Sequence, residues 1–335
     1  MKRYLMTFAL TAVSAAVIPA AALSLAGKKA SPPPSPGESF VEEAEISPGA
    51  PYRVLDISTG KVEEVPVRDY VIGAVCAEMP AAFEEEALKA QAAAAHTYAE
   101  RQRMLAESSP DPELCGADFS NDPGKYQGWL SIDEIKRYYG DDFEEYYGKI
   151  SSAADQVMDC IITYRDEPII PAFHSMSPGM TESAENVWGA PVDYLVPVES
   201  LSDTTAPRYL EEAQFSGEVL RDKLERAFPE ISLSGDMADW VKITDISDSG
   251  TVLSAQVGGR DVTGGELRTA LGLRSACFEY SAQGDTATFT TKGFGHGVGM
   301  SQYGANAMAQ AGSTWQEILA HYYPGSTLTF PENPR

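Results

Sequence analysis

The sequence predicts an α+β fold: one large exported domain of mixed strands and helices, preceded by an N-terminal transmembrane helix. Short strand-like runs end at glycine turns, and the helical stretches lie apart from them instead of alternating with them. The Ala-rich stretch 84–107 predicts one long helix, which we expect to line a groove. A hydrophobic fraction of 43% in 335 residues suffices for a sizeable core.

The net charge of −24 limits the kinds of partner this chain can have. Nucleic acid requires a basic surface against its phosphates, so we expect no nucleic-acid partner. The same charge argues against adsorption to anionic lipid. It is typical of an acidic, soluble surface.

Residues 1–27 predict a membrane anchor or a signal sequence. Lys2 and Arg3 precede an apolar run long enough to cross a bilayer, which keeps this end cytoplasmic. Small residues at 20–22 leave cleavage as the less favoured alternative. Residues 28–50 form a Pro-rich linker, so we expect a single-pass protein of the cell membrane whose domain, 51–330, is extracytoplasmic.

The first elements of the domain are a hairpin and two helices. Residues 52–67 alternate around a Thr59-Gly60 turn, which indicates two antiparallel strands. Residues 67–77 have helical spacing and are followed by Pro80, which ends the helix. Three glutamates at the start of 84–107 suit the positive end of a helix dipole.

The remainder alternates between loops, short strands and short helices. Residues 107–149 are acidic and loop-rich, with a short helix at 131–139, and 201–236 carry helical patterns. Strands are expected at 160–172 (around Arg165-Asp166), 240–247, 251–259 and 277–293, and helices at 266–271, 301–311 and 314–323. Gly312 ends the first of the last two helices, and Thr314 with Glu317 forms a capping box for the second.

The four cysteines show neither a C-x-x-C pair nor zinc-finger spacing. A disulfide between Cys115 and Cys160 stays open as an alternative, because spacing alone cannot establish it.

Glu78 is the single charged residue in the apolar stretch 71–83. A carboxyl group in an apolar pocket keeps its proton to higher pH and can serve as a general acid. The alternative is a structural glutamate, either paired with Lys89 or accepting backbone N–H bonds. Composition alone favours the structural role.

Lys89, His96 and Arg103 are seven residues apart, so they fall on one face of the predicted long helix. Such a row can face a groove and hold hydroxyl or carboxylate groups of a substrate. It can also be a solvated stripe, which is the commoner case.

Two further segments are rich in polar residues and glycine. Residues 173–189 carry His, Ser, Thr, Glu, Asn and Trp around Pro178-Gly179, and 293–305 have a glycine on each side of His296. This glycine spacing lets the backbone approach a ligand or fold sharply. The phosphate-loop pattern is missing, so we expect no nucleotide site.

Taken together, these segments resemble one family, stage II sporulation protein D. The segments that carry the resemblance are DYVIGAVCAEMPAAFEEEALKAQAAAAHTYA (69–99), HSMSPGMTESAENVWG (174–189), ELRTALGLRSACF (266–278), and GFGHGVGMSQYGANAMAQAG (293–312) followed by ILAHYY (318–323). The resemblance covers 51–329, and several long motifs in the same order make it specific.

The resemblance implies a membrane-anchored lytic transglycosylase without a cofactor. Its substrate would be peptidoglycan glycan strands stripped of stem peptides, cleaved during forespore engulfment beside a cell-wall amidase and a membrane-protein partner. Glu78, in the E-M-P motif, would be the catalytic acid. Amidase-enhancer proteins share the domain, so a non-catalytic, glycan-binding activator of an amidase is the alternative.

One carboxyl group suffices for this chemistry. Glu78 would protonate the glycosidic oxygen and then accept the proton of the sugar's own hydroxyl as that hydroxyl attacks the anomeric carbon, which gives an anhydromuramoyl end. A thiol hydrolase that uses Cys76 and His296 is a third hypothesis, disfavoured because Cys76 lies in a helix that we expect to be buried.

The remaining site residues follow from the matched motifs. They are expected to bind substrate or, for those near Pro178 and in the Gly-rich loop, only to shape their turns: Lys89, His96, Gln127, His174, Ser177, Thr181, His296 and Gln302.

Three positions depart from the family pattern. His96 stands where the family commonly has Arg; histidine is shorter and changes charge near neutrality, so we expect activity to be weaker or more pH-dependent. Pro178 stands in place of Gly and restricts its turn. Ser120 and Tyr126 replace cysteines that bind zinc in some relatives, so we expect no structural zinc.

Overall fold

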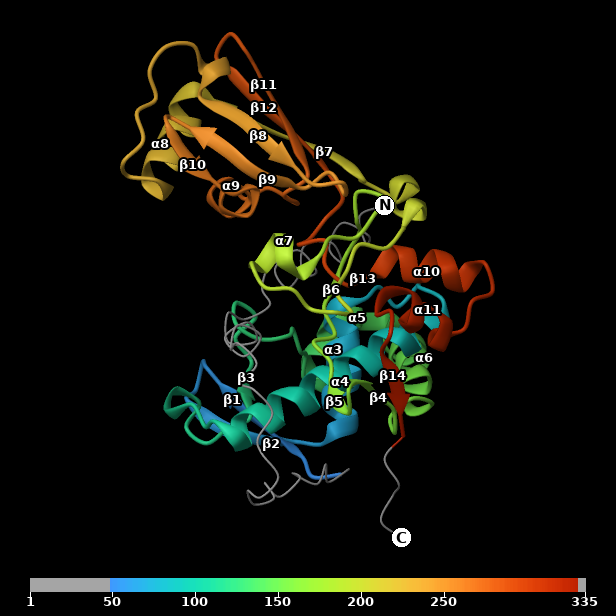
Figure 1. Ribbon diagram of the computed structural model, residues 1–335. Helices are drawn as coiled ribbons and strands as arrows, with labels where there is room; N and C mark the ends of the chain where they lie inside the picture. Colours follow the sequence, from blue (N-terminus) through green and yellow to red (C-terminus); the bar gives the residue numbers. More distant parts are fainter. Residues whose placement is uncertain (1–48, 331–335) are drawn as a thin grey trace, which may run out of the picture. The chain divides into compact units, whose positions relative to one another are not determined.

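The computed structural model describes residues 49–330, which form a mixed α+β fold, as predicted. The sequence indicated one domain, whereas the described chain divides into two compact units. The first consists of residues 49–171, 312–320 and 325–330, and the second of 172–311 and 321–324. Figure 1 labels the helices and strands of both units. The expected membrane segment and most of the linker fall in residues 1–48, outside the described residues.

The first unit opens with the predicted hairpin. Strands β1 (Tyr52–Asp56) and β2 (Lys61–Val65) pair antiparallel, with Tyr52 opposite Val65. The side chain of Asp56 holds the turn by accepting the hydroxyls of Ser58 and Thr59. A third strand, β3 (Phe119–Ser120), joins β1 in parallel and was not expected from the sequence.

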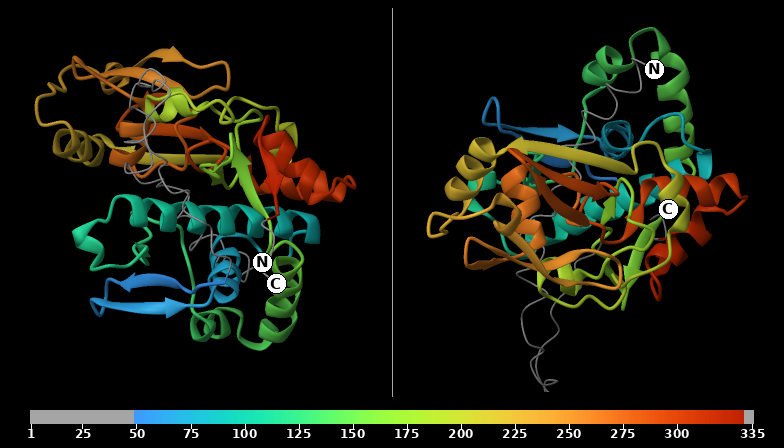
Figure 2. Two further views of the ribbon diagram at one scale, coloured as in Figure 1. Left: turned by 60° about the horizontal axis from the view of Figure 1, so that its bottom comes forward. Right: turned by 90° about the horizontal axis from the view of Figure 1, so that it is seen from above.

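Two helices, α3 (Val67–Glu78) and α4 (Glu85–Ser108), lie side by side in this unit (Figures 1 and 2). Helix α3 ends where Met79 becomes extended, because the residue before a proline disfavours helical backbone. The alanines of α4 from Ala87 to Ala99 are buried, which allows neighbouring elements to approach its backbone closely. Both helices match the predicted bounds within one residue.

Two more helices complete the helical part of the first unit. Helix α5 (Ile132–Tyr139) was predicted, and the capping box of Ser131 and Glu134 starts it. Helix α6 (Phe143–Asp155) lies where the sequence indicated loop. It packs against α3 and α4 with Ile150, Ala153 and Ala154 buried. The apolar residues Phe143, Tyr147, Ile150 and Ala154 recur at helical spacing, so a local signal for this helix was present and was missed. Short 3-10 turns, η1 (Pro112–Leu114) and η2 (Gly140–Asp142), connect these elements.

The C-terminal part of the chain returns to the first unit. The predicted strands β4 (Ile161–Tyr164) and β5 (Glu167–Pro168) are present, and Arg165 and Asp166 have positive φ in their turn. Strand β14 (Thr327–Thr329) pairs antiparallel with β4. Helix α11 (Trp315–Tyr322) begins with the predicted capping box of Thr314 and Glu317.

Two three-stranded antiparallel sheets and two helices share one core in the second unit. These elements are β7 (Leu210–Ser216), α8 (Gly217–Ala227), β8 (Val241–Ile246), β9 (Val252–Val257), β10 (Arg260–Val262), α9 (Gly264–Leu271), β11 (Phe278–Gln283) and β12 (Thr286–Lys292). Phe289 and Leu267 are completely buried in this core. Strand β7 lies in the region expected to be helical, because its backbone pairs along its whole length with β12.

The rest of the second unit surrounds a short parallel pair, β6 (Phe173–His174) and β13 (Met300–Ser301). Helices α7 (Ala184–Trp188) and α10 (Gln302–Gln310) and the 3-10 turn η3 (Leu201–Thr205) belong to this part, whereas the turn η4 (Met237–Asp239) packs into the core of the two sheets. The glycines before β13 pack directly against the segment of β6. A Cβ on Gly299 would lie 2.0 Å from the carbonyl oxygen of Ala172, and one on Gly295 would lie 2.7 Å from Cβ of His174. The glycine pattern therefore serves close packing onto the segment that carries His174.

All four cysteines are free, so the Cys115–Cys160 disulfide left open by the sequence does not form here. Among the described residues, no helix has both the length and the apolar composition to cross a bilayer.

Candidate active site

Glu78 is the last residue of α3, and its side chain is buried, with 3% of its surface exposed. Its Oε1 accepts the main-chain N–H of Gly128 at 2.9 Å. A Cβ at position 128 would lie only 2.7 Å from this oxygen, so the absence of a side chain there makes the contact possible. The burial of Glu78 is what a general acid requires. Its bond to a backbone N–H is a feature expected of a structural glutamate, so both features occur together.

Tyr70 and Tyr98 lie close enough to Glu78 to interact electrostatically with its carboxylate. Burial raises the pKa of Tyr70 and of Tyr98, and the neighbouring Glu78 carboxylate raises both further. Both phenols therefore stay protonated near neutrality and can donate hydrogen bonds. Tyr70 packs edge-on against Tyr52 and is stacked with Trp129, which makes this side of the site aromatic.

Gln127 directly precedes Gly128, whose N–H bonds Glu78. Its main-chain N–H donates to the hydroxyl of Tyr98 at 3.2 Å. Its side chain is buried, and neither Oε1 nor Nε2 has a hydrogen-bond partner among residues 49–330. An unsatisfied buried amide costs on the order of 1–3 kcal/mol, so a polar ligand group or water that bonded it would recover free energy.

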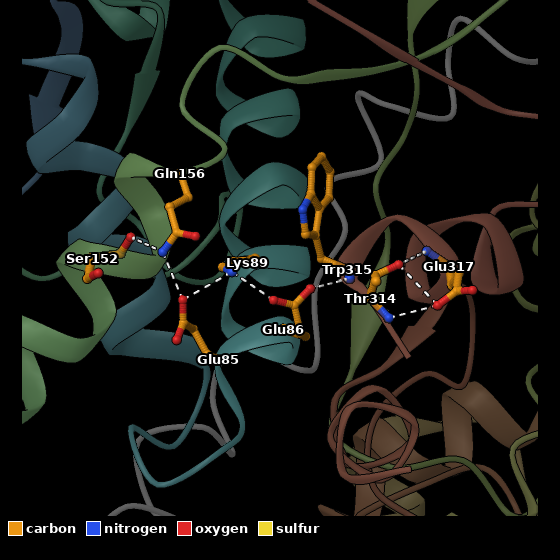
Figure 3. Close-up of polar contacts among 8 residues, drawn as sticks. All are labelled: Glu85, Glu86, Lys89, Ser152, Gln156, Thr314, Trp315 and Glu317. Atoms are coloured by element: carbon orange, nitrogen blue, oxygen red, sulfur yellow. Dashed lines mark hydrogen bonds and ion pairs between the residues drawn. The ribbon is translucent and has the colours of Figure 1, made fainter. Parts of the chain in front are cut away.

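Lys89 is held by carboxylates of its own helix (Figure 3). Its Nζ lies 3.0 Å from Oε1 of Glu85 and 2.7 Å from Oε1 of Glu86. Although burial opposes it, the bonds from Glu86 and Glu85 raise the pKa of Lys89, so its ammonium stays charged. The other oxygen of Glu86 accepts the N–H of Trp315 at 2.8 Å, so the lysine belongs to a network that fixes the start of α11 on α4.

His96 and Arg103 share a second buried network, around Glu100. Arg103 Nη2 donates to Glu100 Oε1 at 2.6 Å, Tyr52 donates to the same oxygen at 2.6 Å, and His96 Nε2 lies 3.6 Å from it. Lys89, His96 and Arg103 are each less than 10% exposed, so the solvated stripe considered from the sequence is wrong. Nδ1 of His96 has no partner within the described part of the chain.

The second unit brings His174 and His296 together, with ring centroids 5.7 Å apart. Burial lowers the pKa of His174 to about 4, and His296 is shifted in the same direction by burial and by the nearby charges. Both rings are therefore neutral near pH 7. Nδ1 of His174 lies 3.1 Å from the carbonyl oxygen of Val298 and donates to it, which leaves Nε2 as a buried acceptor with no partner in the described residues.

Ser177 and Thr181 are completely buried and bond to their own loops. Thr181 Oγ1 accepts the N–H of Val198 at 2.9 Å. Ser177 donates both its N–H and its hydroxyl to Oδ2 of Asp203 at 2.7 Å. These contacts favour the alternative in which both residues shape the turn. Gln302, the first residue of α10, is also buried.

Asp203 was missed by sequence reasoning. It is completely buried, and its Oδ1 accepts the hydroxyl of Ser301 at 2.9 Å, so it joins the segment that carries Ser177 to the start of α10. Burial raises the pKa of Asp203 even though several serines donate to it. No local pattern could have identified it, because Ser301 lies 98 residues away in sequence.

The structure therefore gathers the predicted residues in two groups. Glu78, Lys89, His96 and Gln127 belong to the first unit, and the group of His174, Ser177, Thr181, His296 and Gln302 belongs to the second. In the first unit, Gln127 is connected to Glu78 through Gly128, whose N–H bonds the Glu78 carboxyl group, and Gln127 itself bonds Tyr98. Tyr98 lies inside the motif DYVIGAVCAEMPAAFEEEALKAQAAAAHTYA and Gly128 directly follows Gln127, which are the signals that could have found them.

Neither a metal centre nor a thiol nucleophile emerges in the described part of the chain. No three His, Cys, Asp or Glu side chains in residues 49–330 are grouped to hold a metal ion. Burial raises the pKa of Cys76 to about 12, so its thiol is protonated near neutrality and is a poor nucleophile.

Comparisons with known proteins agree with the motifs of this site. A family model described as stage II sporulation protein matches residues 56–164, which include Glu78, α4 and Gln127. Stage II sporulation protein D of Bacillus subtilis is 37% identical over 309 residues, 92% of this chain and 87% of that protein. The protein of the same name from Bacillus amyloliquefaciens is 41% identical over 293 residues, 87% of this chain and 81% of that protein.

A more distant relative is named amidase enhancer. This Bacillus subtilis protein is 29% identical over 308 residues, 77% of this chain but 40% of its own length. With the identity and coverage of the two sporulation proteins, the motifs around Glu78 establish that the chain belongs to the stage II sporulation protein D family.

Proposed function

We propose that the protein is a lytic transglycosylase that cleaves peptidoglycan glycan strands stripped of stem peptides, with Glu78 as its single acid and base. The observation that carries this proposal is the setting of Glu78: a buried carboxyl group at the end of an apolar helix, held by one backbone N–H. Apolar surroundings favour the neutral form of a carboxyl group, which is the form that can protonate a leaving oxygen.

The reaction needs one proton to move twice. Glu78 gives its proton to the glycosidic oxygen as the bond to the anomeric carbon breaks. The resulting carboxylate then accepts the proton of the sugar's own hydroxyl, and that hydroxyl forms the new bond to the anomeric carbon. The product carries an anhydromuramoyl end, and Glu78 is protonated again, so no second carboxylate is required to activate water.

The residues proposed to bind substrate differ in whether their polar groups are already bonded within the protein. Within residues 49–330, the carboxamide of Gln127 and Nε2 of His174 have no hydrogen-bond partner, so each could bond a sugar hydroxyl. The ammonium of Lys89 and the hydroxyl of Ser177 are already engaged, which favours positioning roles for them. His296, Gln302 and Thr181 support the loops of the second unit in this proposal, and His96 takes the place of the family's arginine.

The proposed setting is the outer face of the cell membrane during sporulation. Residues 1–27 anchor the chain as a single-pass segment, and 28–50 carry the catalytic part away from the bilayer. A cell-wall amidase that removes stem peptides supplies the substrate, and a second membrane protein is the other partner. No cofactor takes part.

The test uses the full chain in detergent with purified glycan strands that carry no peptides. Mass spectrometry of the products should detect anhydromuramoyl ends with the wild type and with Glu107→Gln, an exposed glutamate of α4. Glu78→Gln should give none. Reducing ends in place of anhydro ends would mean that water is the nucleophile, which contradicts the single-carboxylate mechanism.

A non-catalytic role is the second candidate, favoured by the relative named amidase enhancer. In this case the chain binds glycan and activates an amidase, and His96 and Pro178 reflect relaxed demands on the site. Wild-type protein that is folded and binds glycan strands, yet yields neither kind of end, would support this role. With intact peptidoglycan and an amidase, the wild type and Glu78→Gln would then raise peptide release equally.

A further inference from the structure

We propose that the main chain of Gln127–Gly128 is a clamp that positions Glu78, so that the transferred proton resides on Oε2 of this residue and not on Oε1. This inference rests on the proposed function and assigns the roles of the two carboxyl oxygens. Gly128 acts through Glu78 and is therefore a positioning residue.

The hydrogen bond of Gly128 distinguishes the two oxygens. Its N–H donates to Oε1 at 2.9 Å. A protonated carboxyl group has one carbonyl oxygen, which accepts, and one hydroxyl oxygen, which carries the proton. Because an N–H already points at Oε1, this atom takes the carbonyl role, and the proton lies on Oε2.

The clamp is fixed to both helices of the site. The N–H of Gln127 donates to the Tyr98 hydroxyl on α4 at 3.2 Å, and the N–H of Leu130 donates to the carbonyl oxygen of Gly73 on α3 at 3.3 Å. Any side chain at Gly73 would collide with this segment, because its Cβ would lie 2.3 Å from the carbonyl oxygen of Leu130. Residues 127–130 are thus held by a hydrogen bond at each end, and Gly128 presents its N–H from a fixed position.

Gly128 offers a substitution that disturbs the carboxyl group more than the fold. Its backbone lies outside the left-handed region, so alanine is sterically permitted, and the atom that the new methyl group meets, Oε1 of Glu78 at 2.7 Å, ends a flexible side chain. We expect Gly128→Ala to turn the carboxyl group away from its position. The fold should survive, whereas proton transfer should not.

The activity arm measures kcat, KM and thermal unfolding of the full chain in detergent. Gly128→Ala should lower kcat on the order of 10²-fold, the usual effect of a misplacement of about 1 Å, with KM and Tm unchanged. Tyr98→Phe should lower kcat less, because the clamp keeps its other bonds. Gly124→Ala is the matched control: it lies in the same loop, and its Cβ would lie 3.1 Å from a carboxylate oxygen, that of Asp122. Full activity of Gly128→Ala would overturn the proposal.

A second arm reads the bond without catalysis. Only two glycines of the chain follow a glutamine, Gly128 and Gly284, so labelling Gln carbonyl carbon and Gly nitrogen leaves two amide signals in a carbon-filtered NMR spectrum. The Gly128 amide proton should move with pH as Glu78 ionises, and this movement should vanish in Glu78→Gln. The signal of Gly284, in the turn between β11 and β12, should behave identically in both proteins.

The two arms separate the possible failures. A Gly128 signal that ignores Glu78→Gln overturns the clamp, whatever the activity. A Gly128 signal that follows Glu78 in a protein that makes no anhydro ends overturns the proposed reaction, and with it the role of Oε2 as proton carrier, but leaves the N–H bond itself established.

Discussion

The phenolic hydroxyl of Tyr52 donates to Oε1 of Glu100 across 2.6 Å, which ties strand β1 to helix α4. Arg103 reaches the same carboxylate, and its guanidinium also lies over the Tyr52 ring, 5.0 Å from the centroid. His96 lies at the edge of this group. The carboxylate of Glu100 is therefore the centre of a buried charge network one helix away from Glu78.

Glu100→Gln should destabilise the protein, most strongly at neutral pH. Burial opposes ionisation of Glu100, but the bonds from His96, Arg103 and Tyr52 outweigh it and place its pKa below the ordinary value of 4.5. Its contribution to stability is therefore present above pH 4.5 and lost as the pH falls through the lowered pKa. Breaking such a buried pair costs about 3 kcal/mol.

Urea unfolding at pH 7 and pH 3 measures this difference. The difference in unfolding free energy between the wild type and Glu100→Gln should be smaller at pH 3 than at pH 7. An equal difference at both pH values would contradict a lowered pKa for Glu100. Asp222→Asn removes an exposed ion pair with Arg226 and serves as the control, with an expected cost under about 0.5 kcal/mol at either pH.

Asp203→Asn should show the opposite pH dependence. Because burial places the pKa of Asp203 above its ordinary value of 3.8, its contribution to stability is fully present below pH 3.8 and is lost as the pH rises through the raised pKa. The wild type should therefore exceed Asp203→Asn in unfolding free energy by more at pH 3.5 than at pH 7.5. Chemical unfolding followed by fluorescence provides the comparison, and a larger gap at pH 7.5 would refute it.

Gln127→Leu separates a ligand-binding role from a structural one. Removal of two unsatisfied buried polar atoms should leave the free protein as stable as the wild type or about 1 kcal/mol more stable. If the carboxamide bonds a sugar, KM for glycan strands should rise at the same time. Gln156→Leu loses a real bond to Glu85 and should leave KM unchanged. A lower Tm with unchanged KM would indicate that Gln127 is only structural.

Cys76→Ala should retain activity. The Cys76 thiol has its pKa raised to about 12 by burial, so it contributes packing and no nucleophile near neutral pH. We expect a loss of about 1 kcal/mol in unfolding free energy from the missing sulfur atom. Inactivity of a folded Cys76→Ala, together with an active Glu78→Gln, would revive the thiol mechanism.

Local patterns predicted the elements whose causes are local. The turn at Thr59-Gly60, the proline after α3 and the alanines of α4 each act within a few residues, and these elements lie where the sequence placed them. Strand β7 was missed because its pairing with β12, far away in sequence, stabilises it. Helix α6 was missed for a different reason: its apolar residues do recur at helical spacing, but they lie in a segment that is also rich in acidic residues.

The candidate site shows the same division. Glu78 was found because it stands alone in an apolar stretch, and Gln127 because it matches the family pattern. The bond between Gly128 and Glu78 joins residues 50 positions apart and leaves no local trace. The buried position of Asp203 depends likewise on serines 26 and 98 residues away. Lys89 was predicted to meet substrate, yet its partners, Glu85 and Glu86, stand within four residues and could have been read from helical spacing.

The bond between Glu86 and the N–H of Trp315, with the pairing of β14 and β4, has a consequence for how the molecule is made. The unit that carries Glu78 lacks the edge strand β14 and the start of helix α11 until residues 312–330 have been synthesised. Residues 172–311, which make up most of the second unit, are synthesised before the C-terminal part of the first unit. A chain truncated before residue 312 would lack the partners of β4 and of Glu86, so the unit that carries Glu78 can complete its fold only late in synthesis.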